Sequence, residues 1–335
     1  MQSVTLIKGD GIGPSIMEVA VNVIEAAGAD IQWVKAEAGM GAFEKYGTPL
    51  PDETLASIEK TRVAFKGPLT TQVGKGFRSI NVELRQRYDL FANVRPAKSW
   101  PGVKTRFDDV DIVVVRENTE GLYCGLEHFL TRKKDVAESL AVVTRSGSER
   151  IVDHAFKYAR ENNRKKVTVC HKANILKFSQ GLFLDVAREV AAKYPDIEFD
   201  EKIIDASCMH MVMDPSQFDV IVTTNMFGDI LSDLTAGLVG GLGLIPGANI
   251  GHDAALFEAV HGSAPDIAGK NLANPTAVLM AGVMMLNYLG QSEAASRMKT
   301  AIEKVIYEGK FVTPDLNPDS KVGTVEMGQA IIDAI

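Results

Sequence analysis

The sequence predicts an α/β fold, in which helices cover both faces of a sheet. Short runs of β-branched and aliphatic residues alternate along the chain with longer stretches that have the spacing of amphipathic helices. At ~150 residues per domain, the 335 residues correspond to about two domains, and no internal repeat or Gly/Ser linker separates them. The composition, with 46% hydrophobic and 24% charged residues, excludes a disordered chain.

The expected elements follow one another from the N-terminus. A strand is expected at residues 4–7, and residues 15–27 have the spacing of a helix that ends at Gly28. Further strands are expected at residues 63–66, 90–94, 112–116, 140–144, 167–171 and 220–223, and helices at 146–162 and 181–193. The pattern is interrupted at residues 98–101 and again at 246–253. These two interruptions predict a central domain inserted into one that is made from both chain ends.

Composition excludes several classes of protein. The formal net charge of −7 argues against a nucleic-acid partner, because such proteins usually present a basic face. A membrane span is excluded, since the longest nearly unbroken apolar run, residues 277–286, is far shorter than the ~20 residues required. Cys124, Cys170 and Cys208 are too widely spaced for a disulfide framework or a zinc site and favour a reducing compartment. The N-terminus enters a strand without a leader, which is typical of a bacterial cytoplasmic protein, although a mature mitochondrial matrix protein would look the same.

Two loops could hold a cofactor. The glycine-rich loop at residues 9–14, GDGIGP, lacks the G-x-G-x-x-G spacing of the Rossmann dinucleotide loop, and no such motif follows another expected strand. A tight turn explains it equally well. The loop with His261 and Asp266 is rich in turn-forming residues, and its composition fits both a cofactor cover and a plain loop.

Arginines recur close to polar residues that favour a helix start. Ser79 and Asn81 can satisfy free backbone N–H groups at such a start, where the helix dipole also stabilises an anion. If Arg85 and Arg95 converge on one pocket, each guanidinium can bind a carboxylate through two hydrogen bonds. Solvated surface arginines and an ordinary helix cap remain the alternative.

Two expected strands end in residues with acid–base chemistry, at the carboxyl ends where α/β proteins commonly build their sites. Arg116 ends an apolar strand and is followed by a polar loop with Tyr123, a candidate proton donor. Lys172 ends another strand and could act as a base when partly desolvated. Loop tyrosines more often pack, and strand-end lysines are more often solvated, so both alternatives stay open.

Three aspartates are candidates for a metal site. Asp229 and Asp233 lie four residues apart on an expected helix, so their carboxylates share one face and repel each other unless a cation lies between them. Asp205 is a third candidate ligand. Ligand sets made only of oxygen favour Mg²⁺ or Mn²⁺. Such a pair is also common on an exposed helix face.

Taken in order, these segments closely resemble the β-decarboxylating dehydrogenases, a family that includes isocitrate, homoisocitrate, 3-isopropylmalate and tartrate dehydrogenases. The resemblance covers essentially the whole chain. It implies the isopropylmalate dehydrogenase-like fold, which is not a Rossmann fold and in which two α/β domains share a central sheet. Residues 1–98 plus 252–335 would form the large, cofactor-binding domain, and residues 99–251 the small domain with the dimer-forming segment.

Within the family, the segment RSINVELR at residues 78–85 resembles the isocitrate form, because Ser79 and Asn81 can bind the distal carboxylate of isocitrate. Homoisocitrate or another 3-substituted malate is the alternative substrate. A non-catalytic regulatory subunit is the alternative from another class. Such subunits lose catalytic positions, whereas Tyr123, Lys172 and all three aspartates are present here.

The resemblance implies metal-dependent oxidative decarboxylation of isocitrate to 2-oxoglutarate and CO₂, with reduction of NAD. Substrate carboxylates would be held by Ser79, Asn81, Arg85, Arg95 and Arg116, Mg²⁺ or Mn²⁺ by Asp205, Asp229 and Asp233, and the cofactor by Ile12, Thr71, His261, Gly262, Asp266, Ile267 and Asn274. Lys172, with Asp205, would take the hydroxyl proton, and Tyr123 would protonate the enol. The site would be shared across a homodimer, with Lys172 and Asp205 from the neighbouring subunit. Further assembly of dimers stays open.

The choice of NAD over NADP is predicted to depend on Asp266 and Ile267. NADP-dependent relatives have a Lys-Tyr pair here, whereas the Asp266 carboxylate can accept hydrogen bonds from both adenosine ribose hydroxyls and would repel a 2′-phosphate. We expect the double substitution Asp266→Lys with Ile267→Tyr to lower kcat/KM for NAD. Steady-state kinetics with both cofactors measure this, and unchanged NAD kinetics would contradict the assignment.

Overall fold

The structure is a computed structural model that describes residues 1–70 and 79–335. Its strands are β1 (Gln2–Ile7), β2 (Ile31–Ala36), β3 (Val63–Lys66), β4 (Ala92–Lys98), β5 (Asp111–Glu117), β6 (Glu127–Phe129), β7 (Ala137–Ser139), β8 (Lys166–His171), β9 (Glu198–Ile203), β10 (Val220–Thr223), β11 (Pro246–Ile250) and β12 (Ala255–Ala259). Its α-helices are α1 (Gly13–Ala26), α2 (Met40–Tyr46), α3 (Asp52–Thr61), α4 (Ile80–Arg87), α5 (Arg145–Glu161), α6 (Ser179–Ala191), α7 (Ile204–Met213), α8 (Asn225–Leu238), α9 (Thr276–Tyr288), α10 (Ser292–Glu308) and α11 (Thr324–Asp333).

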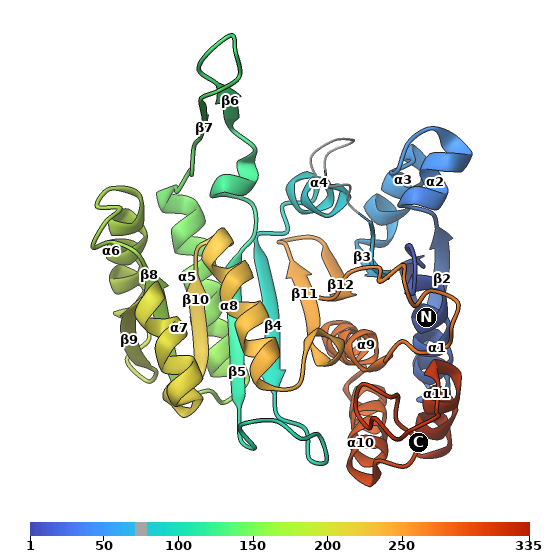
Figure 1. Cartoon of the computed structure of the whole chain (residues 1–335). Helices are drawn as coiled ribbons and strands as arrows, with labels where there is room; N and C mark the ends of the chain where they lie inside the picture. The colour runs from blue at the N-terminus through green and yellow to red at the C-terminus, as the bar shows by residue number, and fades with distance from the viewer. Residues whose placement is uncertain (71–78) are drawn as a thin grey trace.

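Ten of these strands form one sheet in the order β2-β1-β3-β12-β11-β4-β5-β10-β8-β9 (Figure 1). The first four are parallel to one another, and so are the last four. Between them, β11 is antiparallel to β12 and to β4, and β4 is antiparallel to β5. The two parallel groups therefore run in opposite directions. A central sheet with helices on both faces confirms the predicted α/β class.

One predicted strand is wrong. Residues 140–144 are not a strand, because β7 ends at Ser139 and Val142 makes only an isolated bridge with Gly121. The Thr144 hydroxyl accepts a hydrogen bond from the N–H of Gly147 and so caps α5, which begins one residue later. The apolar run therefore leads directly into a helix. The strand predicted at residues 90–94 is present as β4 but begins later and extends further.

Side chains on the two faces of the sheet enter different hydrophobic cores. One face packs in a single core against α1, α9, α10 and α11 and, over the other half of the sheet, against α5 and α6. The opposite face has two separate cores, one with α3 and α4 and the other with α7 and α8. On β5, Val113 and Val115 enter the single core and Val114 enters the core of α7 and α8, as expected for alternating strand side chains.

A row of buried polar side chains lies between the two cores of that second face. Lys66 pairs in register with Glu258, Asn249 with Asn93, and Asn93 with Arg116. Together with Arg95, these side chains form what we call the polar strip: Lys66, Glu258, Asn249, Asn93, Arg95 and Arg116. All six are buried, and they cross five neighbouring strands from β3 to β5. Of the Lys, Arg, Asp and Glu side chains buried in the described part of the chain, all but Glu117 lie in this strip.

We propose the domain division 1–98 plus 252–335 and 99–251. The chain enters the middle segment at the end of β4 and leaves it through β11, and these two strands are neighbours at the centre of the sheet. An insertion needs its two ends close together in this way.

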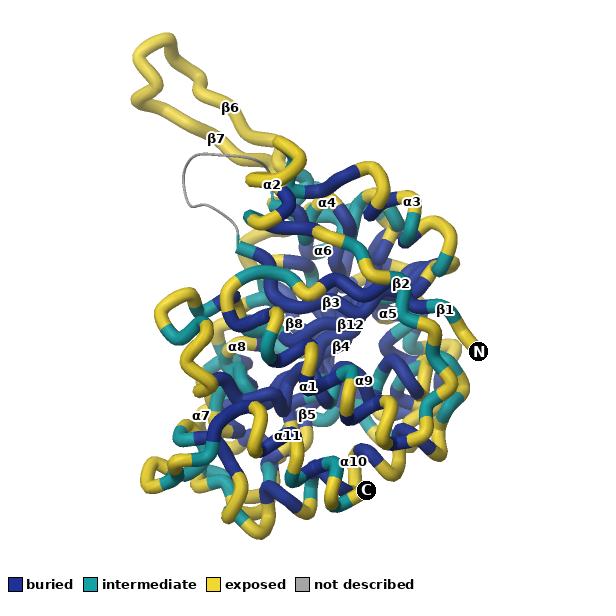
Figure 2. The backbone as a smooth tube through the Cα atoms, turned by 90° about the vertical axis from the view of Figure 1, so that its right-hand side faces the viewer, coloured by how far each residue is buried: buried dark blue, intermediate teal, exposed yellow. Residues whose placement is uncertain are grey.

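A hairpin of β6 and β7 projects from the body of the molecule (Figures 1 and 2). Within the described residues its strands pair only with each other, and every residue of both strands is exposed. A two-stranded ribbon is at best marginally stable alone. Among the helices of residues 1–70 and 79–335, none is long and apolar enough to span a membrane.

Candidate active site

Arg116, at the carboxyl end of β5, is held beneath the first turns of α8. Its side chain is 1% exposed, and its Nε and NH2 donate hydrogen bonds of 3.0 and 2.7 Å to Asn225 Oδ1. Its NH1 pairs with Asp229 Oδ1. Gly228 leaves the room for this arrangement, because a Cβ at that position would lie 2.5 Å from Arg116 Cγ. The start of α8 thus fixes where the guanidinium points.

Arg95 lies in the middle of β4 and faces the same helix. Its NH1 donates a 2.7 Å hydrogen bond to Ser232 Oγ and lies 3.5 Å from Asp229 and 3.7 Å from Asp233. Burial and the charge of Arg85 lower the pKa of Arg95, while the carboxylates oppose that change. An arginine in such company keeps its charge. Arg95 therefore adds a second buried cation beside Arg116.

Arg85 brings a third guanidinium from α4. Its NH2 lies 3.6 Å from Glu258 Oε1, and its side chain is 11% exposed. Burial first, and then the charges of Arg95 and Arg85, lower the pKa of Arg116, as expected for three cations gathered in one place. The guanidiniums of Arg85, Arg95 and Arg116 thus lie close enough together to affect one another, as predicted.

A cavity of about 110 Å³ opens between α4 and the polar strip. Its lining includes Asn81, Arg85, Arg95, Glu258 and His261. Among the described residues, Asn81 Oδ1, Arg85 Nε and His261 Nε2 are buried polar atoms without a hydrogen-bond partner. Such atoms cost free energy unless a ligand satisfies them. Ser79 occupies the N-cap position of α4, as predicted.

Tyr123 lies in a short 3₁₀ helix (Leu122–Cys124) that faces α8. Its hydroxyl donates a 2.7 Å hydrogen bond to Asp229 Oδ2, and the Arg116 guanidinium lies 5.0 Å from its ring centroid. Burial and the hydrogen bond to Asp229 raise the pKa of Tyr123, so the phenol is protonated at neutral pH. A protonated hydroxyl fixed in this way can serve as a proton donor.

Asp229 and Asp233 present two carboxylates from α8, as predicted. Burial opposes ionisation of Asp229, but Arg116, Tyr123 and Arg95 outweigh it and lower the pKa of that carboxyl. Burial raises the pKa of Asp233, and the charge of Asp229 adds to the effect. Two adjacent carboxylates of which one resists ionisation would both be stabilised by a divalent cation.

Asp205, on α7, forms a separate pair with Lys172 at the end of β8. The Lys172 ammonium contacts the Asp205 carboxylate and lowers its pKa. The Asp205 side chain is 69% exposed. Within residues 1–70 and 79–335 of one chain, no three His, Cys, Asp or Glu side chains come close enough to hold a metal ion. The three predicted ligands therefore fall into two groups, Asp229 with Asp233 and Asp205 with Lys172.

Five of the residues predicted to bind the cofactor, namely Ile12, His261, Gly262, Asp266 and Ile267, lie on two loops that contact each other. The N–H of Ile12 donates a 2.9 Å hydrogen bond to the carbonyl of Ser263, so the glycine-rich loop and the loop of His261 and Gly262 are joined. Burial lowers the pKa of His261, which favours the neutral ring. Asp266 is exposed and Ile267 is half-buried in the same loop.

Two further predicted cofactor positions need separate mention. Both ends of the Asn274 amide are occupied, since Oδ1 accepts from the N–H of Thr276 and Nδ2 donates to Asp315 Oδ2. Its side chain therefore braces the start of α9. Thr71 lies outside the described residues.

Sequence reasoning missed several residues that hold the site together: Lys66, Asn93, Asn225, Ser232, Asn249 and Glu258. The Lys66 ammonium lies 2.7 Å from Glu258 Oε2, and both are buried. A usable signal was present, because a charged or amide residue at one position of an otherwise apolar strand is expensive to bury. The segments VAFK, GANI and ALFEA each contain one such residue.

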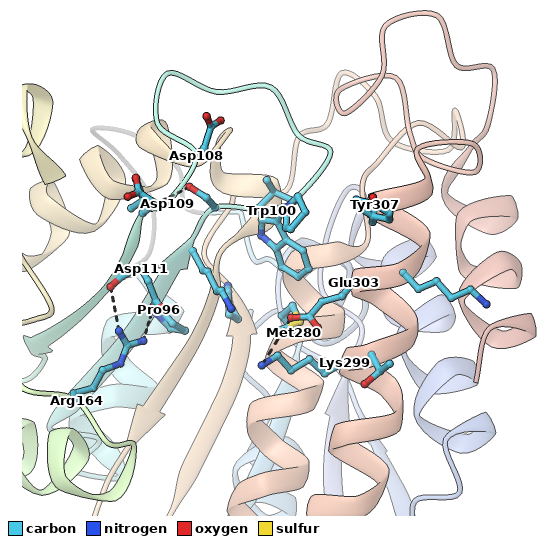
Figure 3. Close-up of a pocket in the computed structure, with 18 residues that line it drawn as sticks. Pro96, Trp100, Asp108, Asp109, Asp111, Arg164, Met280, Lys299, Glu303 and Tyr307 are labelled. Atoms are coloured by element: carbon cyan, nitrogen blue, oxygen red, sulfur yellow. Dashed lines mark hydrogen bonds and ion pairs between the residues drawn. The ribbon is translucent and has the colours of Figure 1, made fainter. Parts of the chain in front are cut away.

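A larger cavity, about 1010 Å³, lies away from these residues, where β4 ends and β5 and β11 begin (Figure 3). It is bounded by the turn that carries Trp100, by Met280 of α9 and by Tyr307 of α10. Arg164 at its edge is already paired with Asp111 and Asp219. None of the predicted catalytic, substrate or metal residues lines it. The size of a cavity therefore does not by itself identify the candidate site. Polar groups that converge on a cavity are the better indicator.

Residues 3–331 match the family described as isocitrate/isopropylmalate dehydrogenase. The chain belongs to this family. A solved structure titled isocitrate dehydrogenase from Methylococcus capsulatus is 63% identical with a TM-score of 0.98, and the match covers 100% of this chain and 99% of that one. This likeness confirms the predicted isopropylmalate dehydrogenase-like fold.

Two curated members of the isocitrate/isopropylmalate dehydrogenase family illustrate how similar this chain is to proteins with different roles. Catalytic subunit 5 of the mitochondrial NAD isocitrate dehydrogenase of Arabidopsis thaliana is 52% identical over 98% of this chain and 87% of its own length. A regulatory subunit of the mitochondrial NAD isocitrate dehydrogenase of Dictyostelium discoideum is 49% identical over 96% and 88%. Overall sequence identity thus does not distinguish catalytic from regulatory members of the family. That distinction has to come from the residues of the candidate site.

We expect Gly228→Ala to lower kcat/KM of the dehydrogenase reaction by up to about a hundredfold, because the new Cβ displaces the Arg116 side chain. Gly237→Ala is the matched control on the same helix, since a Cβ there meets nothing within 4 Å. Steady-state kinetics of both variants, with their melting temperatures, measure the effect. Equal kinetics in the two variants would show that the position of Arg116 is unimportant.

Proposed function

We propose that this chain is a catalytic NAD-dependent isocitrate dehydrogenase, which oxidises isocitrate and releases CO₂ to form 2-oxoglutarate with the help of Mg²⁺ or Mn²⁺. The observation that carries the proposal is the gathering of three guanidiniums in one place. Those of Arg95 and Arg116 pair with Asp229 of α8, which also accepts from the Tyr123 hydroxyl, and that of Arg85 lies beside Glu258. Membership of the family and the names of its similar members support the same reaction.

The charges of the site suit a tricarboxylate. Guanidiniums bind carboxylates through paired hydrogen bonds, and a site with low exposure strengthens each of them. The Asn81 side chain in the cavity lining and the Ser79 position at the start of α4 support recognition of the distal carboxylate from the same side, because an amide nitrogen and a hydroxyl can both donate to it. An alkyl group at this place would leave these polar atoms unsatisfied, which disfavours an isopropylmalate-type substrate.

The proton transfers follow from the two groups of side chains. As the Lys172 ammonium gives one of its protons to the contacting Asp205 carboxylate, its nitrogen takes the proton of the C2 hydroxyl, while the hydride leaves C2 for NAD. After CO₂ is lost from the β-keto acid, Tyr123 delivers a proton to C3. The raised pKa of Tyr123 keeps this proton in place until it is needed.

The residues present fit the metal and the cofactor that the reaction requires. Asp229 and Asp233 offer two carboxylates on one helix face, and Asp205 of a second copy of the chain would complete the oxygen ligands. The unsatisfied His261 Nε2 fits a hydrogen-bonding group of NAD, whose adenosine would lie toward Asp266 and Ile267. When bound, the metal polarises the hydroxyl and later the carbonyl oxygen, and NAD accepts the hydride.

A homodimer with shared sites is part of the proposal. Large apolar side chains are exposed around α6, α7 and α8, among them Ile175, Leu176, Phe178, Met209, Val212, Met213 and Ile230, and others on the hairpin of β6 and β7. Exposed apolar surface of this extent marks a protein interface. Lys172 and Asp205 lie in the same region, where a second copy could use them.

We also propose a location in the bacterial-type cytoplasm. Among the described residues, Cys124, Cys170 and Cys208 form no disulfide, which suits a reducing compartment. The Arabidopsis and Dictyostelium relatives are named mitochondrial, and the matrix is the alternative.

Turnover of isocitrate with NAD and Mg²⁺ or Mn²⁺ by the purified chain tests the proposed function. We expect Tyr123→Phe to reduce kcat by roughly a hundredfold or more with little change in the isocitrate KM, because only the proton donor is lost. Tyr307→Phe on α10 is the matched control, since this tyrosine is 69% exposed and far from the site residues in sequence. Full activity of Tyr123→Phe would refute its role, and a wild type inactive on isocitrate would refute the function.

Coexpression of two inactive variants tests whether the site is shared. Tyr123→Phe and Lys172→Met should each be nearly inactive alone. A heterodimer of the two has one site in which Tyr123 and Lys172 are both intact, so activity should return. Differently tagged chains allow the heterodimer to be purified before the assay. An inactive heterodimer would mean that each protomer uses its own Lys172.

A further inference from the structure

We propose that Asn249 and Asn93 are positioning residues that orient the substrate-binding Arg95 and the Glu258 carboxylate through one chain of buried hydrogen bonds. The inference rests on the proposed function and deepens it, because it names residues that prepare the substrate site without touching the reacting atoms.

The chain of hydrogen bonds is continuous across the middle of the sheet. Arg95 Nε donates to Asn93 Oδ1 at 2.6 Å, and Asn93 Nδ2 donates to Asn249 Oδ1 at 2.7 Å. Asn249 Nδ2 then donates to Glu258 Oε1 at 2.8 Å. Four side chains on β4, β11 and β12 are thereby joined end to end.

The two ends of the chain determine which way both amides face. A guanidinium can only donate, so the Asn93 oxygen must face Arg95, and its nitrogen is left for Asn249. An ionised carboxylate can only accept, so the Asn249 nitrogen must face Glu258. Although burial opposes it, Lys66 and Arg85 lower the pKa of Glu258 to about 2, which keeps this end an acceptor. Both ends demand the same orientation, and neither amide can flip without breaking two bonds.

The consequence reaches two substrate arginines. With its Nε satisfied by Asn93, Arg95 directs NH1 toward Ser232 and the carboxylates of α8. At the other end, the oxygen of Glu258 that accepts from Asn249 is also the one nearest to Arg85, at 3.6 Å. One chain of hydrogen bonds thus sets the guanidiniums of both β4 and α4.

A purely structural role would not require amides at these positions. Asn249 is 0% exposed and Asn93 is 1% exposed, in strands whose other inward residues are mostly apolar. Two apolar side chains could fill the same space without the cost of desolvating two amides. Asn118 donates to the same Asn249 oxygen at 3.0 Å, so the junction is further restrained from the end of β5.

The test compares Asn249→Leu, Asn93→Leu and the double variant with the wild type. Each single variant should raise the isocitrate KM roughly tenfold, with a smaller change in the NAD KM, because a broken chain releases the substrate arginines. The double variant should be about as impaired as either single one, since one interruption already breaks the chain. Thr168→Val in β8 is the matched control, because this buried hydroxyl has no partner among the described residues, and its kinetics should stay unchanged.

The outcomes separate this inference from the proposed function. A wild type that does not oxidise isocitrate overturns both. With an active wild type, single variants whose isocitrate KM stays within twofold, or effects that simply multiply in the double variant, overturn the positioning role alone. Should Asn249→Leu fail to fold, Asn93→Asp serves instead. It keeps an acceptor for Arg95 but sets two oxygens against each other at Asn249, and an unchanged isocitrate KM in that variant also overturns the proposal.

Discussion

Burial of opposite charges on one face of the central sheet is the interaction on which the rest of the site depends. Lys66, Arg95 and Arg116 are almost fully enclosed, and ions so placed cost several kcal/mol each unless they are paired. Glu258 and Asp229 supply the compensating charge. Because the strip consists of polar side chains, the second face has two cores instead of one, with α3 and α4 on one side and α7 and α8 on the other. The site occupies the interval between them.

The direction of the strands explains why the site lies on a face and not at one edge. The strands on either side of β11 and β4 run in opposite directions, so their carboxyl ends point to opposite edges. Arg116 comes from a strand end, but Arg95 comes from the middle of β4 and Arg85 from a helix. The positive charge gathered there is local. Because this cluster of arginines lies in a chain of net charge −7, the net charge of the whole chain does not predict the charge of the ligand that the cluster suits.

Much of the fold and many site residues could be predicted from the sequence, and the gaps have physical causes. Alternating apolar strands and helices predicted the α/β class, and resemblance brought together motifs far apart in the chain. The prediction of a strand at residues 140–144 was wrong because Thr144 caps the start of α5. The hydrogen bond that makes this cap is local, and hydrophobic periodicity does not report it. Asn249 and Glu258 were missed because the partners of their hydrogen bonds and ion pairs lie on other strands. Which residues meet there depends on the register of the sheet, which the sequence does not report. In the proposed homodimer, the position of Asp205 relative to Asp229 would depend on how two copies of the chain meet, which the sequence of one chain does not report.

A crystal structure of the protein with isocitrate and Mn²⁺ would test most directly whether the polar strip and the three guanidiniums form the substrate site. We expect the substrate carboxylates to contact Arg85, Arg95 and Arg116 between α4 and α8, with the metal ion at Asp229 and Asp233. Isocitrate bound elsewhere, for example in the large cavity beside Trp100 and Met280, with the three guanidiniums left without substrate, would contradict this assignment.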